Sequence, residues 1–132
     1  EVISEILKAD IILIAPSNPL VSIAPILSVP GIRDALRKRR EDVIAISGII
    51  NGKALKGPAD RLLNELGFET SAAAVAEIYK DIVRTFVIDD LDKSESKRIQ
   101  ELELSCIITD TVMANSAKAA GLCRTIFTEI TD

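Results

Sequence analysis

Four short apolar runs, rich in β-branched residues, constrain the fold of this chain more than any other feature of its sequence. They cover residues 11–15, 43–47, 85–88 and 106–109. None of them alternates strictly between apolar and polar side chains, which is the pattern of strands buried on both faces, as in a parallel sheet. Helical spacing appears outside these runs, at residues 2–9, 32–39, 59–66, 72–81, 94–102 and 115–129.

The alternation of strands and helices predicts an α/β fold with an open, mostly parallel, Rossmann-like sheet. The interval between the second and third strands, residues 48–84, is long and holds two of the helical patterns. We therefore expect a helical insertion beside the sheet. The 132 residues have the length of a single domain, and we assign residues 1–132 to one.

The composition of the chain disfavours several kinds of binding partner. The net charge is −4, aromatic residues make up 3% of the chain and Trp is absent, which disfavours a nucleic-acid partner. The run Arg37-Lys38-Arg39-Arg40 ends a predicted helix and is followed by Glu41-Asp42, so we interpret it as a solvated face. No apolar stretch approaches the roughly 20 residues that span a bilayer, and the two cysteines form no redox or zinc motif. We expect no membrane partner and a cytoplasmic protein.

The chain contains no histidine. This removes Ser-His and Cys-His nucleophile pairs and His-ligated metal sites from consideration. Chemistry must then depend on carboxylates, lysines, hydroxyls, backbone amides or a hard cation, which are the groups that handle phosphates.

Two loops that follow predicted strands carry groups that could bind a phosphate. They also lie where ligands of open α/β sheets bind, outside the carboxyl ends of the strands. The first contains Ser17, Asn18 and, slightly later, Ser22, and the helix expected to start there would offer free amides to a phosphate. An ordinary helix cap explains the same residues equally well. The second loop, residues 51–60, has Lys53 and Lys56 between glycines, and a solvated turn is its alternative interpretation.

Carboxylates follow the third strand at Asp89, Asp90 and Asp92, where Mg²⁺ or sugar hydroxyls would find ligands, although turn and cap roles are also typical of such residues. Thr109-Asp110-Thr111 is expected to cap the helix after the last strand.

Several segments, in order, resemble the 2-phospho-L-lactate transferases of deazaflavin coenzyme biosynthesis. The matching strings are Ala15-Pro16-Ser17-Asn18-Pro19-Leu20-Val21-Ser22, Val29-Pro30-Gly31-Ile32-Arg33, Lys56-Gly57-Pro58-Ala59-Asp60-Arg61, Phe86-Val87-Ile88-Asp89 and Asp110-Thr111-Val112-Met113. The resemblance implies transfer of a phospholactyl group, or a related phospho-acid, from a guanylylated donor to a deazaflavin precursor, with Mg²⁺ as cofactor and release of GMP.

The same resemblance implies roles for individual residues. Ligand-binding residues would be Ser17, Asn18, Ser22, Lys53, Lys56 and Asp60, and Asp89 is a candidate metal ligand. Family members are longer than this chain and begin with a strand and a Gly-rich loop. We therefore expect residues 1–132 to be the C-terminal part of a transferase, with the catalytic residues in the N-terminal half and no activity in this chain alone.

Two other interpretations remain at this stage. The gluconeogenesis-factor family is similar in fold and resembles nucleotide-sugar binding proteins, but it usually has Pro-Gly-Ser-Leu where this chain has Pro16-Ser17-Asn18-Pro19. A non-catalytic fragment kept for its fold or for homodimer contacts, through apolar positions such as Ile126, Phe127 and Ile130, is the third interpretation.

Overall fold

The computed structural model describes residues 1–17, 19–54, 67 and 69–131. Its centre is a four-stranded sheet formed by β1 (Ile12–Ile14), β2 (Val43–Ile46), β5 (Thr85–Asp89) and β6 (Ser105–Thr109). The strands lie in the order β1-β2-β5-β6, and every neighbouring pair is parallel. The predicted α/β class and the four strand positions are confirmed.

The crossovers between these strands contain most of the helices. Between β1 and β2 lie η1 (Pro19–Ile23, a π-helix), α2 (Ala24–Leu27), α3 (Ile32–Lys38) and η2 (Arg40–Asp42), and α1 (Val2–Lys8) precedes β1. Between β2 and β5 lie β3 (Ile49–Ile50), β4 (Lys53–Ala54) and α5 (Ala72–Tyr79). The 3-10 helix η3 (Asp90–Glu95) and α6 (Ser96–Gln100) connect β5 to β6, and α7 (Ser116–Thr131) follows.

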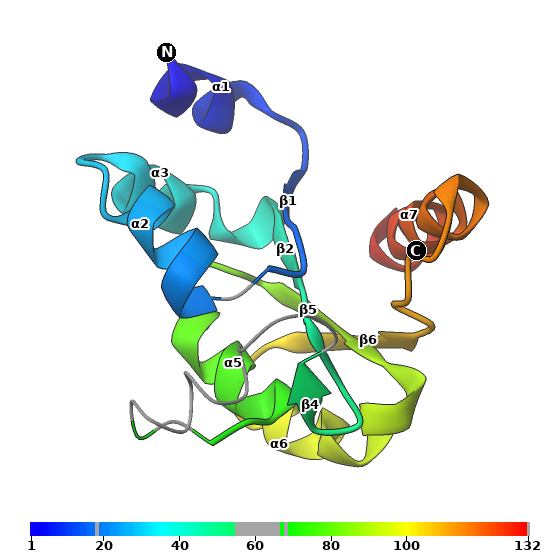
Figure 1. Cartoon of the computed structure of the whole chain (residues 1–132). Helices are drawn as coiled ribbons and strands as arrows, with labels where there is room; N and C mark the ends of the chain where they lie inside the picture. The colour runs from blue at the N-terminus through cyan, green and yellow to red at the C-terminus, as the bar shows by residue number, and fades with distance from the viewer. Residues whose placement is uncertain (18, 55–66, 68, 132) are drawn as a thin grey trace.

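The strand order explains why the two faces of the sheet are covered so differently. Crossovers of one hand that advance in one direction across a sheet place their helices on the same face. The larger apolar cluster accordingly joins Val43, Ala45, Phe86 and Ile88 to side chains of α2, α3, α5 and α6. Figure 1 shows these helices on one side of the sheet and α7 alone on the other.

The second face uses the alternate residues of the same strands, because successive side chains of a strand point to opposite sides. Ile44, Ile46, Val87 and Ile107 pack there against α7. Since α7 is a single helix, it does not reach all of β1, and Leu13 keeps 38% of its surface exposed. The central strands β2 and β5 are buried throughout, as the sequence predicted for them.

Three sequence-based expectations need correction or completion. The last helix spans Ser116–Thr131, close to the predicted 115–129, but Thr109-Asp110-Thr111 does not cap it: Asn115 Oδ1 accepts a hydrogen bond from the Lys118 amide at 2.9 Å. The insertion between β2 and β5 contains the expected helix α5, but also the β3–β4 hairpin, which was not predicted. The helix expected at residues 59–66 lies outside the described residues.

The dimer hypothesis for the last helix also changes. Ile126 is fully buried and so is not available to a second copy, whereas Ile130 is partly buried against the cluster under α7. Phe127 remains 41% exposed.

Candidate functional site

The loops predicted to bind ligands gather at the carboxyl edge of the sheet. The end of β1 leads to Ser17, the end of β2 to Gly48, the end of β5 to Asp89, and the end of β6 to Thr111. Because the four strands are parallel, all of these ends lie along one edge. The sequence thus predicted correctly that these loops share one edge of the sheet.

The β1 loop lies directly against the end of β2. The Ser17 amide donates to the Ala15 carbonyl at 2.8 Å, which turns the chain sharply after β1. A Cβ atom added to Gly48 would lie only 3.3 Å from the Pro16 carbonyl oxygen, so the two backbones are in contact there. Gly48 therefore lets the loop that carries Ser17 approach the end of β2, and the sequence analysis did not single it out.

The segment after this loop differs from the helix that was expected. η1 is a five-residue π-helix, and α2 continues it with Pro25, which has no amide hydrogen to donate to the preceding turn. So short an element adds little to a helix dipole, and the expected anion site on free N-terminal amides loses its basis. The side chains of Ser17 and Ser22 are both exposed. Asn18 lies outside the described residues.

The β3–β4 hairpin carries Lys53. Its turn consists of Asn51 and Gly52, whose φ angles of 53° and 74° are both positive, as a two-residue type I′ turn requires. Lys53 pairs with Ile50 across the hairpin and is exposed. Asn-Gly directly after the apolar pair Ile49-Ile50 is the signal from which this hairpin could have been predicted. The predicted ligands Lys56 and Asp60 lie outside the described residues.

Asp92, which the sequence analysis left as a cap or cation ligand, binds the hairpin. Its side chain is 3% exposed, and its two carboxylate oxygens accept hydrogen bonds from the amides of Asn51 and Gly52, each at 3.0 Å. Burial raises the pKa of Asp92, and the nearby Glu95 and Asp89 act in the same direction, against the two amides, which lower it.

Asp89, the candidate metal ligand, binds the end of β6. It is 4% exposed; one carboxylate oxygen accepts from the Thr111 amide at 2.9 Å and from the Thr111 hydroxyl at 3.1 Å, and the other accepts from the Leu91 amide at 3.0 Å. Thr111 is thus a partner of Asp89 and not a cap of the last helix. Asp110 instead accepts from the Val112 amide and pairs with Lys118 at 3.0 Å.

The carboxylate of Asp89 is engaged in hydrogen bonds within the protein. No group of three or more Asp, Glu, Cys or His side chains that could hold an ion occurs within the part of the chain that the structure describes. Mg²⁺ takes six ligands in near-octahedral geometry, commonly one or two carboxylates together with waters and substrate phosphates. A cation at Asp89 would have to compete with the three donors from which its oxygens already accept. The contacts of Asp89 are those of a structural link between β5 and β6.

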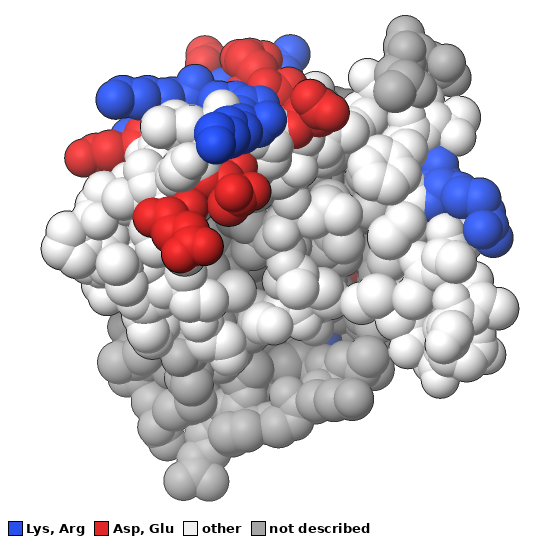
Figure 2. Space-filling view, turned by 90° about the horizontal axis from the view of Figure 1, so that it is seen from above, with Lys and Arg blue, Asp and Glu red and all other residues white. Residues whose placement is uncertain are grey.

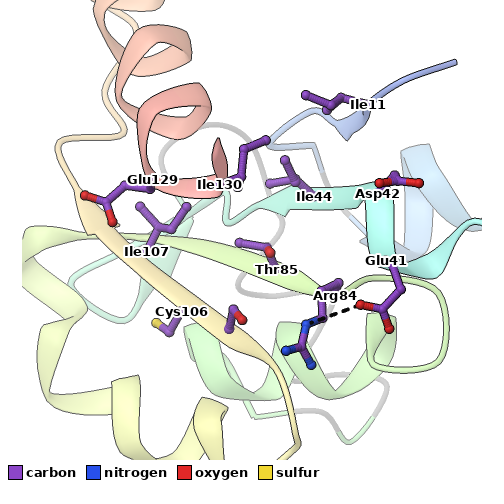
Figure 3. Close-up of a pocket in the computed structure, with 11 residues that line it drawn as sticks. Ile11, Glu41, Asp42, Ile44, Arg84, Thr85, Cys106, Ile107, Glu129 and Ile130 are labelled. Carbon is purple, nitrogen blue, oxygen red and sulfur yellow. Dashed lines mark ion pairs between the residues drawn. The ribbon is translucent and has the colours of Figure 1, made fainter. Parts of the chain in front are cut away.

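A separate hollow of about 490 Å³ lies at the opposite, amino-terminal edge of the sheet (Figure 3). Ile44, Ile107 and Ile130 form its apolar side, and Glu41 pairs with Arg84 at 3.6 Å on its rim. Cys106 also lines it, and burial raises the pKa of this thiol to about 11. Among the predicted ligand residues that the structure describes, Ser17, Ser22 and Lys53, none lines this hollow.

The basic run at the end of α3 binds within the molecule and is less solvated than expected. Arg37 pairs with Asp34 and Asp81, and Arg39, with 19% of its side chain exposed, pairs with Asp42 and donates to the carbonyls of Ile6, Leu7 and Ala9. These bonds hold α1 against α3. Figure 2 shows acidic and basic side chains intermixed on the face it presents, with no field of one sign there.

No helix in the described residues is both long and apolar enough to cross a membrane.

Comparison with known proteins gives a consistent result. The family model described as 2-phospho-L-lactate transferase CofD matches residues 1–126. A 2-phospho-L-lactate transferase of Methanosarcina mazei is 39% identical over 115 residues, which are 87% of this chain and 37% of the relative. Another, of Methanothermobacter thermautotrophicus, is 36% identical over 129 residues, 98% of this chain and 42% of the relative.

A phosphoenolpyruvate transferase of Nocardia farcinica is 44% identical over 114 residues, which are 83% of this chain and 34% of the relative. The chain therefore spans 34–42% of the length of these three relatives.

Proposed function

Because the chain belongs to the 2-phospho-L-lactate transferase CofD family, we propose that it forms one wall of the active site of a transferase. The reaction would move 2-phospho-L-lactate, or a related phospho-acid, from a guanylylated donor to a deazaflavin precursor and release GMP. This chain would be the C-terminal part of that enzyme, with the catalytic residues in the part of the relatives that it does not span.

The contact between the β1 loop and Gly48 is the observation that supports this proposal best. It holds Ser17 at the carboxyl edge of a parallel sheet, which is where α/β proteins bind nucleotides. The β3–β4 hairpin presents Lys53 at the end of the neighbouring strand. A hydroxyl and a cation from two adjacent loops are suited to a diphosphate.

The proposed transfer needs groups that bind and orient more than it needs a nucleophile from the protein. The terminal hydroxyl of the deazaflavin precursor attacks the phosphorus that carries the lactyl oxygen and gives its proton to solvent. A new P–O bond forms, the bridging P–O bond breaks, and GMP leaves. Lys53 would neutralise charge on the phosphoryl oxygens, since positioning and electrostatic stabilisation dominate phosphoryl transfer. Ser17, Asn18, Ser22, Lys56 and Asp60 are proposed to complete the donor and acceptor contacts.

Mg²⁺ is proposed as cofactor of the whole enzyme, where it would neutralise the phosphate oxygens. Asp89 stays the candidate ligand that the resemblance implies, although its oxygens already accept three hydrogen bonds within the protein. No step of the transfer is assigned to a metal held by Asp89.

The phospho-acid of the donor, the cellular location and the oligomeric state are also proposals. Relatives named for phospholactate and for phosphoenolpyruvate both match this chain, so either phospho-acid is compatible with the family. A cytoplasmic location accords with two free cysteines. A homodimer, if formed through α7, would use Phe127, and sedimentation across a concentration series would measure it.

The activity can be tested in a chimera in which this chain replaces the matching segment of the Methanosarcina mazei relative. We expect the chimera to release GMP from the guanylylated donor when the deazaflavin precursor is present, and the isolated 132-residue chain to show no turnover. A folded chimera without turnover would refute the transferase assignment.

Ligand choice provides a second test. Calorimetric titration of the chimera with GDP and with a UDP-sugar should show preference for GDP. Preference for the UDP-sugar would instead favour a nucleotide-sugar binding protein of the gluconeogenesis-factor type.

A further inference from the structure

Asp92 is a buried carboxylate outside the predicted ligand set. Its carboxylate is nearly buried, and the two amides that it accepts from lie 41 and 40 residues earlier in the sequence. Burying a carboxylate is costly unless its oxygens are hydrogen-bonded, and here both are. A contact this distant in sequence and this close in space ties two separate loops together.

The hairpin needs such a contact to hold its place. β3 and β4 are two residues long each and pair only at Ile49↔Ala54 and Ile50↔Lys53. A two-stranded hairpin is marginally stable by itself, and one this short is less so. Ile49 anchors one end in the core at 3% exposure, and Asp92 anchors the turn.

Lys53 follows this anchored turn directly. Lys53 pairs with Ile50, and because side chains alternate along a strand, both lie on the face of the hairpin opposite to the buried Ile49; the Lys53 side chain is exposed. It forms no ion pair with any residue of the described ranges 1–17, 19–54, 67 and 69–131. No described residue therefore neutralises the charge of Lys53 in an ion pair.

We infer that Asp92 is a positioning residue: it locks the Asn51–Gly52 turn so that Lys53 is held at the carboxyl edge of the sheet, ready to contact the phosphates of the guanylylated donor. The inference rests on the proposed function and deepens it. It also changes the predicted mode of binding. The amides of Asn51 and Gly52 already donate to Asp92, so the hairpin would bind phosphate through the Lys53 side chain and not through these backbone amides.

The test compares four forms of the chimera: the parent, Asp92→Asn, Lys53→Met and the double variant. Asp92→Asn replaces one accepting oxygen with an amide that cannot accept. We expect it to raise KM for the guanylylated donor by about ten- to a hundredfold, the range of one charge-assisted hydrogen bond. KM for the deazaflavin precursor should stay unchanged. Lys53→Met should have a similar effect, and the double variant should be little worse than either single one, because both act through one contact.

Asp81→Asn is the matched control. Asp81 receives hydrogen bonds from Arg33 and Arg37 just before β5, at the other edge of the sheet, so its loss costs stability without touching the hairpin. Its KM for the donor should equal that of the parent. Three results would overturn the inference while leaving the transferase assignment in place. The effects of the two substitutions on the donor KM could add in the double variant, or Asp92→Asn could change the KM of donor and precursor equally. Asp81→Asn could also change the donor KM as much as Asp92→Asn does.

A readout independent of activity separates the two proposals further. In the 132-residue chain, Asp92→Asn should speed hydrogen exchange of the Asn51 and Gly52 amides by about tenfold or more relative to the Asp81→Asn chain. Unchanged exchange would refute the anchoring. A parent chimera that is folded but inactive would refute the proposed function, and with it the role of Lys53 towards the donor, even where exchange shows the anchor intact.

Discussion

Replacing Asp89 with Asn separates a structural carboxylate from a metal ligand. In the structure Asp89 accepts three hydrogen bonds, from the Leu91 amide, the Thr111 amide and the Thr111 hydroxyl. The asparagine side chain keeps one accepting oxygen and places an NH₂ group where the other oxygen was. Whichever way the amide turns, a donor then faces a buried donor.

The size of the effect follows from these contacts. If the remaining oxygen keeps both bonds to Thr111, one charge-assisted bond to Leu91 is lost and the other two become weaker. A hydrogen bond to a charged group contributes about 1.5–3 kcal/mol, and relief of burying the charge offsets part of the loss, so we expect about 2–3 kcal/mol. With an unfolding entropy of about 2.1 cal/mol/K per residue, Tm should fall by about 7–11 °C.

Calorimetric melting of the 132-residue chain, in EDTA and again in MgCl₂, measures this. We expect the same drop in Tm in both buffers, and Asp90→Asn, an exposed neighbour, should stay within about 0.5 kcal/mol of the parent. If Mg²⁺ raised Tm of the parent and Asp89→Asn abolished that increment, Asp89 would be a metal ligand and the structural interpretation would be wrong.

Three further substitutions or measurements test the packing. Tyr79→Phe should raise the free energy of unfolding by about 1–2 kcal/mol in urea titration, because the buried hydroxyl has no hydrogen-bond partner among the described residues; a loss would reveal one. Gly48→Ala should lower the free energy of unfolding by about 1–3 kcal/mol, because the added methyl group would press against the β1 loop. Gly121→Ala, at an open position in a helix, should raise that free energy. Equal effects of the two substitutions would contradict the contact between Gly48 and the β1 loop. In a Cys123→Ser background, labelling of Cys106 should accelerate about tenfold per pH unit from pH 8 towards its pKa of about 11; a plateau near pH 8 would contradict the raised pKa.

The sheet was predictable because its signal is local. Each of the four strands is a run of three to five residues in which β-branched side chains recur, and central strands buried on both faces need apolar residues at every position. The edge strands show where the pattern misleads: Leu13 on β1 and Ile108 on β6 are apolar but exposed at 38% and 42%. The composition of a strand therefore does not show whether the strand lies at the edge or at the centre of the sheet.

The elements that were missed are short or lack a sequence template. β3 and β4 have two residues each, below the length at which alternation can be recognised, and their turn was interpreted as a loop. The π-helix after β1 directly precedes α2, and Pro19 and Pro25, which both suit the first turn of an ordinary helix, do not distinguish this outcome from an ordinary cap. Both errors fall on the loops of the candidate site, where backbone geometry deviates most from regular elements.

The carboxylates after β5 show why contacts distant in sequence decide the site. Asp89 and Asp92 were predicted as possible cation ligands because acidic side chains at strand ends suit Mg²⁺. Their four oxygens instead accept five hydrogen bonds. Asp89 accepts three, from the Leu91 amide and from the amide and hydroxyl of Thr111, and Asp92 accepts two from the turn of the hairpin. A cation at either carboxylate would have to compete with these donors. The segment between β5 and α6 therefore joins the loops of the carboxyl edge to each other, and a ligand contact made by Lys53 depends on the carboxylate of Asp92, a residue that no ligand needs to touch.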